Sequence, residues 1–310
     1  MSAAPGTAFG DTAFKDTAFG DTALRDPLTV FAAERGRLRS LAYRLLGSVA
    51  ESEDVLQDAW LRWSAVDPAA VGTPAAFLTT MVTRLALDRL RAARTVRERY
   101  YGLWLPEPEV SSWDDEVEAA DQVPMAMMLL LERLAPDQRA VFVLREAMDL
   151  DYAEIAAILG KSAEACRQIM RRARGRLAEP SAANARPEAG RRLADAFAEA
   201  SVRRDYAAIV SLLSDDALWL GDGGGVALTA LNPIRGADRI ARFIIGVQRK
   251  HGRAFAFTPV RVNGGPGFLT THGGVFSGVW ALDIADGRIT RLYKIANPHK
   301  LAHVTPPSGL

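Results

Sequence analysis

A turn of three residues between two short apolar stripes constrains the fold of this chain more than any other feature of its sequence. The stripes run from Tyr152 to Leu159 and from Ser162 to Leu177, and both repeat apolar residues at helical spacing. Gly160 is suited to end the first helix, and Ser162 is suited to cap the second. Residues 137–177 are therefore predicted to form a helix-turn-helix. The stripes would pack on an earlier helix through Val141, Phe142 and Leu144, with the second stripe contributing Cys166, Ile169 or Met170, Ala173 and Leu177.

The opposite face of the second predicted helix is basic. After Glu164 it has no acidic residue up to Leu177, and it carries Arg167, Gln168, Arg171, Arg172, Arg174 and Arg176. Early residues of a recognition helix meet base edges in the major groove, and later arginines contact phosphates. Gln168 can pair with adenine, and Arg167 or Arg171 can pair with guanine. We predict a DNA-reading helix, with a merely solvated arginine-rich helix as the alternative. The predicted DNA contacts are Ser162, Glu164, Arg167, Gln168, Arg171 and Arg172.

Charge is strongly segregated along a chain whose net charge is only +1. Six arginines and two acids lie between Arg84 and Arg99, whereas seven acids and no Lys or Arg lie between Glu107 and Gln122. The overall balance excludes a globally basic nucleic-acid coat, so the charges have to be interpreted segment by segment. The first stretch is predicted to be a basic helix end. The second begins among prolines and is predicted to be an acidic linker.

The cysteine and histidine content limits other kinds of site. Cys166 is the only cysteine and can form no internal disulfide, and the four histidines lack the spacing of zinc ligands. No apolar run reaches the roughly 18 residues that span a bilayer, and the N-terminus lacks a basic segment followed by an apolar one. The sequence therefore predicts a cytoplasmic protein with no membrane segment, no metal and no cofactor.

Periodicity divides the chain into segments of different character. A five-residue repeat from Thr7 to Asp26 matches neither the helix nor the strand period. Residues 1–27 are therefore predicted to be a disordered tail, or alternatively a small peptide docked on a partner. The remaining segments are, in order, helical residues 28–97, the linker 98–124, helical residues 125–179, a hinge at 180–190 and an α+β unit at 191–303.

The last unit changes from helical to alternating patterns. A helical stretch from Arg191 to Leu213 precedes a predicted hairpin, in which Trp280–Ile284 and Arg288–Tyr293 flank a turn at Ala285–Gly287. Glycine-rich loops are expected at Gly221–Gly225 and Asn263–Gly267. The first of them has no following Lys-Ser or Lys-Thr, so it is not a phosphate-binding loop.

Two helical blocks carry a specific resemblance. The segment Leu41–Ser48 followed by Glu53–Trp63 resembles region 2 of bacterial RNA polymerase sigma factors of the extracytoplasmic function (ECF) group, and residues 137–177 resemble region 4. The resemblance implies promoter-directed transcription initiation. It implies core RNA polymerase, through its β′ clamp helices and β subunit, and promoter DNA as partners. The contact with the clamp helices would be made by Asp54, Gln57 and Asp58, which from spacing alone form an acidic, exposed helix face.

By the same resemblance, residues 68–80 and the following helix would open and read the minus-10 promoter element, and region 4 would read the minus-35 element. Melting requires arginines along the strand and an apolar or aromatic wall for a flipped base. Phe77, Arg84, Arg89 and Arg91 are predicted to supply these groups. A position of Phe77 in the protein core is the alternative.

The linker and the last unit narrow the resemblance to the ECF41, or sigma J-like, group. The motif Tyr100–Pro108 and the segments Gly221–Gly225, Val262–Gly267 and Ala296–Leu301 lie where that group has its linker motif, loops and tail. This resemblance implies a C-terminal α+β domain of the SnoaL/NTF2-like type, a cone-shaped barrel with an apolar pocket, which regulates the two all-α sigma domains in cis. Interdomain contacts are assigned to Trp104, Leu105, Pro106, Glu107, Pro108, Asp222 and Asn263.

Two other functions remain open from the residues alone. A SnoaL-like cyclase or isomerase would need an acid or a histidine inside the cone. Asp222, Asp283 and His272 are the candidates, and the alternation around Asp283 predicts that this side chain faces solvent. A one-component regulator would sense a ligand with the last unit and bind an operator with the helix-turn-helix. The region 2 resemblance favours a sigma factor that is not an enzyme, and leaves open an unidentified small ligand of the last unit.

Overall fold

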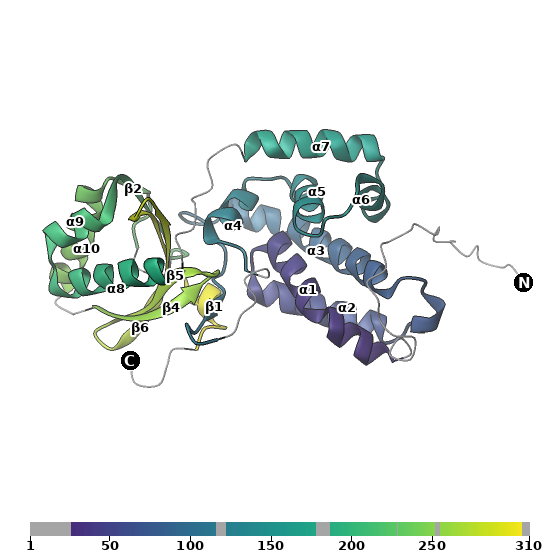
Figure 1. The fold of residues 1–310 in the computed structure, drawn as a ribbon, viewed down its shortest axis with the longest axis horizontal. Helices are drawn as coiled ribbons and strands as arrows, with labels where there is room; N and C mark the ends of the chain where they lie inside the picture. Colours follow the sequence, from purple (N-terminus) through teal and green to yellow (C-terminus); the bar gives the residue numbers. More distant parts are fainter. Residues whose placement is uncertain (1–25, 116–121, 178–186, 228, 252–254, 306–310) are drawn as a thin grey trace, which may run out of the picture.

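The computed structural model describes residues 26–115, 122–177, 187–227, 229–251 and 255–305. They form two lobes, one of helices and one of strands and helices, and part of the linker lies between them (Figure 1). Residues 1–25 of the predicted repeat tail, 116–121 of the acidic linker and 178–186 of the predicted hinge lie outside the described residues. None of the described helices has the length and hydropathy needed to cross a membrane.

Local signals set the ends of the helices in the first lobe. The Asp26 side chain accepts a hydrogen bond from the Thr29 N–H (3.0 Å), and Gly47 ends the first helix in the left-handed conformation (φ 68°). Asp26 and Pro27 therefore belong to this helix and its cap, not to the tail in which the sequence analysis placed them. The helices of this lobe are α1 (Pro27–Leu46), α2 (Val49–Trp63), α3 (Pro74–Glu98), α4 (Met125–Glu132), α5 (Pro136–Glu146), α6 (Tyr152–Leu159) and α7 (Ala163–Arg176), with a 3-10 turn at Pro68–Ala70.

One apolar core runs through the whole helical lobe. It is continuous from Leu38 of α1 and Trp63 of α2 to Met170 of α7. Arg139 of α5 is buried within it and donates hydrogen bonds to Leu45 O (2.8 Å) and Leu131 O (2.8 Å). Its guanidinium also forms an ion pair with Glu132 (2.7 Å). The units predicted at 28–97 and 125–179 are therefore packed against each other in this structure.

The second lobe is built on one mixed sheet. In the described residues the strand order is β1-β4-β5-β6-β7-β2-β3, and every neighbouring pair is antiparallel except β2 and β7. The predicted hairpin is confirmed: β6 and β7 pair up to Ala285 and Arg288, around Asp286 (φ 51°) and Gly287 (φ 71°). The elements are α8 (Pro187–Arg203), α9 (Tyr206–Leu212), β2 (Leu213–Asp222), β3 (Ile234–Arg235), α10 (Ala237–His251), β4 (Phe255–Val262), β5 (Gly265–His272), β6 (Val275–Ala285), β7 (Arg288–Ile295) and a 3-10 turn at Pro298–Leu301, joined by β1 (Val110–Ser111) of the linker.

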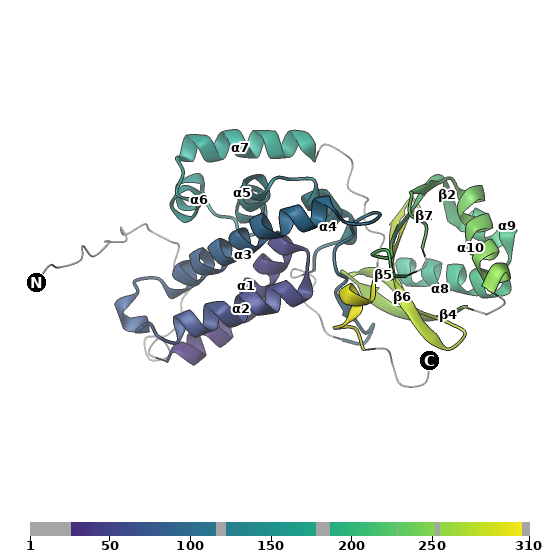
Figure 2. The ribbon, with the colours of Figure 1, turned by 180° about the vertical axis from the view of Figure 1, so that it is seen from behind.

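The sheet curves around α8, α9 and α10, as the view from behind shows (Figure 2). On its inner face Trp219, Trp280 and Leu292 share an apolar core with Phe197 of α8 and Ile244 of α10. The predicted fold class is therefore confirmed: all-α units are followed by an α+β domain whose sheet wraps an apolar interior.

The outer face of the sheet is buried too, because it packs against the linker and α4. Leu105 and Met125 from outside the domain share a core with Leu220, Val279 and Tyr293 of the strands. A strand covered on both faces is buried at successive residues, as β6 is from Gly278 to Ile284. The second lobe thus contributes a hydrophobic surface to the first.

Double coverage makes the prediction for Asp283 wrong. The residue is only 4% exposed, and its carboxylate accepts a hydrogen bond from the Tyr293 hydroxyl (2.6 Å). Burial raises the pKa of the Asp283 carboxyl. Its neighbours Leu282 and Ile284 belong to the inner core, so Asp283 lies on the opposite, outer face of the sheet and not inside the cone.

Four boundaries also differ from the sequence analysis. The stretch predicted as one helix up to Leu213 is broken between α8 and α9, where Arg204 adopts a left-handed conformation (φ 56°). Helix α8 begins at Pro187, within the predicted hinge, because proline suits the first turn of a helix. Gly265–Gly267 pair within β5, which reduces the predicted loop to a tight turn at Asn263 and Gly264. The predicted linker begins with the last residue of α3, Glu98, and part of it forms the strand β1, which pairs with β4.

Candidate nucleic-acid interface and the contact between the lobes

Helices α6 and α7 form the predicted helix-turn-helix geometry. The Asp151 side chain caps α6 through the Ala153 and Glu154 N–H groups (2.8 Å each), and Gly160 ends it with φ 65°. The Ser162 hydroxyl then accepts a hydrogen bond from the Ala165 N–H (3.1 Å) and caps α7. Of the two residues left open for the second stripe, Met170 is buried, whereas Ile169 is only partly buried at the core margin. The turn orients α7 across α5 at the edge of the molecule (Figure 1).

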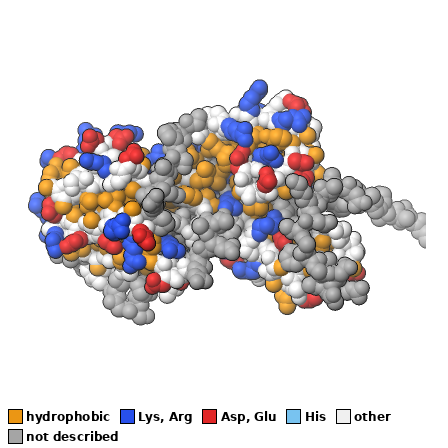
Figure 3. All heavy atoms as spheres, in the orientation of Figure 1, with side chains coloured by type: hydrophobic (Ala, Val, Ile, Leu, Met, Phe, Trp, Pro, Cys, Tyr) orange, Lys and Arg blue, Asp and Glu red, His pale blue; other side chains and the backbone are white. Residues whose placement is uncertain are grey.

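The outward face of α7 is basic. Its arginines stand along the upper edge of the molecule in the space-filling view (Figure 3). Arg167 forms an ion pair with Glu164 (2.9 Å), and its guanidinium lies 5.9 Å from the centre of the Tyr152 ring. The remaining polar residues of this face are exposed as well, namely Gln168, Arg171, Arg172, Arg174 and Arg176. Arg174 and Arg176 also contact α5, through Glu146 (2.6 Å) and the Gln138 side chain (3.0 Å). The exposed Gln168, Arg171 and Arg172 leave the rest of this face open to a polyanion.

The residues predicted to contact core polymerase, two acids and one glutamine, lie on one side of α2. Asp54 and Gln57 are exposed, and Asp58 is half-buried. Arg89 of α3 bridges the two carboxylates, with Nη1 3.1 Å from Asp54 and Nη2 2.8 Å from Asp58. Two sets of residues that the sequence analysis assigned to different partners are therefore ion-paired to each other.

The other residues predicted to contact the minus-10 element also have partners inside the protein. Arg84 donates hydrogen bonds to Ile158 O (3.0 Å) and Ala157 O (3.3 Å) at the end of α6. Arg91 pairs with Asp137 of α5 (2.9 Å). Phe77 is partly buried, with its ring 5.8 Å from that of Trp63. The contacts of Arg84 and Arg91 join α3 to α6 and α5, so in this structure these predicted DNA-binding arginines pair with groups of the protein although their side chains remain exposed.

Asp222, at the end of β2, is the centre of the contact between the lobes. Its side chain is buried and accepts hydrogen bonds from the Leu105 N–H (2.9 Å), the Tyr100 hydroxyl (2.5 Å) and the Lys300 ammonium (2.7 Å). Lys300 also donates to the Leu105 carbonyl. Burial lowers the pKa of Lys300 to about 8, and the nearby Asp222 carboxylate opposes this shift. Both backbone polar groups of Leu105 are thus held by one buried ion pair.

The ring of Trp104 lies between cations of the two lobes. Lys300 Nζ is 3.3 Å from the ring centre, and the guanidinium carbon of Arg97 is 4.9 Å from it. Arg97 is fixed in turn by Glu132 (2.6 Å). The indole therefore connects α3 and α4 to the C-terminal lobe.

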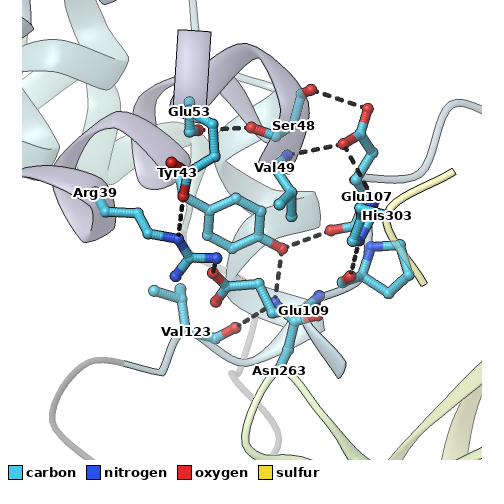
Figure 4. A network of polar contacts seen from close by, with 12 residues as sticks. Arg39, Tyr43, Ser48, Val49, Glu53, Glu107, Glu109, Val123, Asn263 and His303 are labelled. Carbon is cyan, nitrogen blue, oxygen red and sulfur yellow. Dashed lines mark hydrogen bonds and ion pairs between the residues drawn. The ribbon is translucent and has the colours of Figure 1, made fainter. Parts of the chain in front are cut away.

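Glu107 caps a helix that is distant in sequence (Figure 4). Its carboxylate accepts hydrogen bonds from the Ser48 hydroxyl (2.9 Å) and the Val49 N–H (2.8 Å) at the start of α2. A carboxylate at this position satisfies free N–H groups and favours the helix dipole. The linker is thereby bonded to the start of α2 as well as to the sheet.

A buried polar chain runs from α1 to the turn between β4 and β5 (Figure 4). The Tyr43 hydroxyl donates to Glu107 O (2.6 Å) and accepts from the Asn263 side-chain amide (2.8 Å). The same amide donates to Val123 O (3.0 Å) at the far end of the linker. Asn263 thus connects α1 with the far end of the linker, and it also exchanges hydrogen bonds with the Glu109 backbone just after the linker motif.

The structure brings all the residues assigned to the interdomain contact into one region and adds others that sequence reasoning missed. The added residues are Tyr43, Tyr100 and Lys300, which contact Asn263, Asp222 and Trp104. Tyr43 lies in the region 2 block, and the other two lie in the linker and tail motifs. Their presence in those motifs was the available signal, but no local spacing indicates which residue meets which.

The three residues considered for catalysis are not assembled into one site. Asp222 is used by the linker and Asp283 lies on the outer face of the sheet, while His272 lines a cavity inside the cone. In the part of the chain that the structure describes, no three His, Cys, Asp or Glu residues are grouped as a metal site would require.

Comparison with known proteins identifies both halves of the helical lobe. The Sigma-70 region 2 family matches residues 30–96, and the Sigma-70 region 4 family matches residues 125–177. The chain is 40% identical over 286 residues to the ECF RNA polymerase sigma factor SigJ of Mycobacterium tuberculosis, covering 87% of this chain and 91% of that protein. It is 32% identical to the "Probable ECF RNA polymerase sigma factor SigI" of the same organism, over 89% of this chain and 95% of that one.

The fold agrees over the same length. The crystal structure of the Mycobacterium tuberculosis extracytoplasmic function sigma factor SigJ matches with a TM-score of 0.72 and 36% identity, covering 89% of this chain and 98% of that one. The similarity therefore includes the C-terminal lobe as well as the two sigma regions. This chain belongs to the extracytoplasmic function group of RNA polymerase sigma factors, which bind core polymerase and direct promoter recognition in transcription initiation.

Proposed function

We propose that the C-terminal lobe regulates this sigma factor in cis, by holding the linker and thereby keeping regions 2 and 4 in a closed arrangement. The observation that carries the proposal is the capture of Leu105, whose N–H and carbonyl are bound by Asp222 and Lys300. A segment with both backbone groups paired to a buried ion pair is docked, not a free tether. The lobe would do the work of a separate inhibitor.

The closed arrangement competes with promoter binding. Arg84 is bonded to the end of α6, and Arg89 is bonded to Asp54 and Asp58. The minus-10 function proposed for these arginines, with Phe77 and Arg91, requires them to exchange protein partners for DNA phosphates and bases. Each partly exposed pair contributes only about 0–1 kcal/mol, so the exchange is accessible once the linker is released.

Trp104→Ala is the direct test of regulation in cis. The variant removes a ring held between Lys300 and Arg97, and should weaken docking without touching α2 or α7. We expect run-off transcription with purified core polymerase, on a promoter upstream of the chain's own gene, to increase about three- to tenfold. Tyr206→Ala is the control, because Tyr206 is an exposed aromatic of α9, whose hydroxyl bonds to Asp238 of α10 and not to the linker. Equal transcript yields from Trp104→Ala and the natural chain would refute the proposed inhibition.

The residues of α7 are proposed to divide into base-reading and phosphate-binding groups. Arg167→Ala and Gln168→Ala should each cost about 1–3 kcal/mol on the preferred minus-35 sequence and alter the preference, because early helix positions meet base edges. Arg176→Ala should weaken binding to all sequences alike. Competition binding with matched and mismatched minus-35 duplexes would measure both effects. If all three variants lost the same affinity for matched and mismatched duplexes, Arg167 and Gln168 would not be base-reading residues.

The polymerase surface is proposed to include Asp54, Gln57 and Asp58, which would contact the β′ clamp helices. Exposure of the first two and partial exposure of the third support this assignment. The same transcription reaction separates a sigma factor with this surface from a one-component regulator. A regulator would bind DNA as well without core polymerase and would not direct a defined start site.

A further inference from the structure

The interior of the cone is hollow, and the contact between the lobes does not use this space. Two adjoining cavities of about 350 Å³ and 340 Å³ lie between α10 and the inner face of the sheet, and share Val247, Phe255 and Lys294 as walls. Volumes of roughly 300–1,000 Å³ are those of small-molecule sites. The second cavity is mainly apolar, and its aromatic walls are Trp219, Phe243, Phe255 and Trp280.

Lys294 brings a buried charge into this space. It lies on β7 with the same strand parity as Leu292 of the inner core, and only 7% of the residue is exposed. Its ammonium is 5.7 Å from the ring centres of both Phe255 and Trp280. Burial lowers the pKa of Lys294 to about 8. Within the described part of the chain, no carboxylate forms an ion pair with it, although buried ammonium groups are normally paired.

The other polar side chains that line the cavities are two basic groups and the hydroxyls of Ser277 and Thr229. His272 and Lys250 line the two spaces, and no Asp or Glu is among the described residues of either wall. The indole N–H groups of Trp219 and Trp280 are buried without a hydrogen-bond partner among the described residues. Buried donors of this kind are normally satisfied. The cavity thus combines aromatic walls with an ammonium group and indole N–H groups that lack an acceptor among the described residues.

We propose that this cavity binds a small aromatic carboxylate, with Lys294 as the counter-charge and the rings of Trp219, Phe255 and Trp280 around the apolar body. A carboxylate would neutralise the buried ammonium and could accept from an indole N–H. The ring system would replace water along an apolar wall. Charge and shape together select this class over neutral or cationic molecules.

The cavity wall is continuous with the segment that holds the linker. Ala296, Pro298 and Leu301 line it, while the intervening Asn297 and Lys300 contact Tyr100 and Asp222. The Ala296 N–H also donates to Asp222 O (2.7 Å). Because one short segment makes both contacts, we expect occupancy of the cavity to alter docking of the linker. This coupling rests on the proposed regulation in cis, whereas the binding site does not.

Calorimetric titration of the full chain with 2-naphthoate tests the site, with 2-naphthalenemethanol as the uncharged match. We expect naphthoate to bind at least about tenfold more tightly than the alcohol. Lys294→Met should abolish that preference and leave the affinity for the alcohol within about twofold, because the apolar walls remain. Arg249→Met, an exposed change on α10, is the matched control and should alter neither affinity.

A second variant tests the binding site even if Lys294→Met does not fold. Val247→Trp fills the space shared by the two cavities and should eliminate binding of both compounds, with an unchanged circular dichroism spectrum. Absence of naphthoate binding to the natural chain, equal affinity for both compounds, or unchanged affinities in Val247→Trp would overturn the proposal. Hydrogen exchange of residues 100–105 with and without naphthoate tests the coupling alone. Unchanged exchange despite binding would reject the coupling and keep the site.

Discussion

Asp222→Asn is expected to release the linker and to speed amide hydrogen exchange at Leu105 by at least about 100-fold. The Leu105 N–H donates directly to the Asp222 carboxylate (2.9 Å), so its exchange reports opening of this contact. The substitution keeps the size of the side chain and removes its charge. Lys300, which is 3% exposed, would then be left as a buried charge without its carboxylate.

The size of this effect follows from the asymmetry of buried ion pairs. Removal of one partner typically costs about 3–5 kcal/mol, whereas replacement of both partners by apolar groups is often nearly neutral. The double variant Asp222→Asn/Lys300→Met should therefore exchange more slowly at Leu105 than Asp222→Asn alone. Asp215→Asn, an exposed carboxylate on the same strand, is the control and should leave exchange unchanged. Equal exchange rates in Asp222→Asn and the natural chain would show that the ion pair does not hold the linker.

Release of the linker should have a functional consequence in the same variant. Asp222→Asn and Trp104→Ala remove different parts of one contact, since Lys300 touches both residues. We therefore expect the two variants to raise promoter-directed transcription to similar extents, and the combined variant to add little further. Full additivity would mean that the two residues act through separate contacts.

The helix-turn-helix could be predicted because its signals are local. Gly160, Ser162 and the apolar spacing lie within one short stretch, and each has a direct physical meaning. The hairpin between β6 and β7 was accessible for the same reason, through Asp286 and Gly287. Such signals determine elements and their immediate neighbours, but not how one lobe meets the other.

The contact between the lobes could not be derived from spacing. Asp222 and Asn263 were assigned to it through a family resemblance alone, and their partners lie far away in sequence. Lys300 is 78 residues from Asp222, and Asn263 is 220 residues from Tyr43. A buried ion pair joining remote segments leaves no periodic pattern. Only the fold reveals which carboxylate lies next to which amine.

The error at Asp283 has a related cause. Alternation along a strand indicates a solvent face only where one side of the sheet is open. Here the outer face is covered by Leu105 and Met125, which come from a different part of the chain. The apolar residues around Asp283 are compatible with a sheet that is open on one face and with a sheet that is covered on both. The prediction for Asp283 assumed the open face. Its hydrogen bond with Tyr293 satisfies a carboxylate that solvent does not reach.

The double variant Asp54→Ala/Asp58→Ala is expected to lower the affinity for core polymerase at least about 100-fold. Truncation of one partner of a charge pair that is buried in an interface typically costs about 2–5 kcal/mol, and we expect these two carboxylates, which lie on one side of α2, to be buried on binding. Titration of fluorescently labelled protein with core polymerase would measure the loss. Asp88→Ala, which removes an exposed carboxylate of α3, is the matched control.

Arg89 makes this prediction more discriminating, because it pairs with both carboxylates in the closed arrangement. If Asp54 and Asp58 served only to hold Arg89, Arg89→Ala would weaken core binding as much as their removal does. If they contact polymerase, Arg89→Ala should leave core affinity unchanged or slightly higher, since it frees both carboxylates for the partner. The same variant should still reduce transcription, because its guanidinium is proposed to contact the minus-10 strand. A loss of transcription without a loss of core binding would therefore separate the two surfaces that this one ion-paired cluster keeps together.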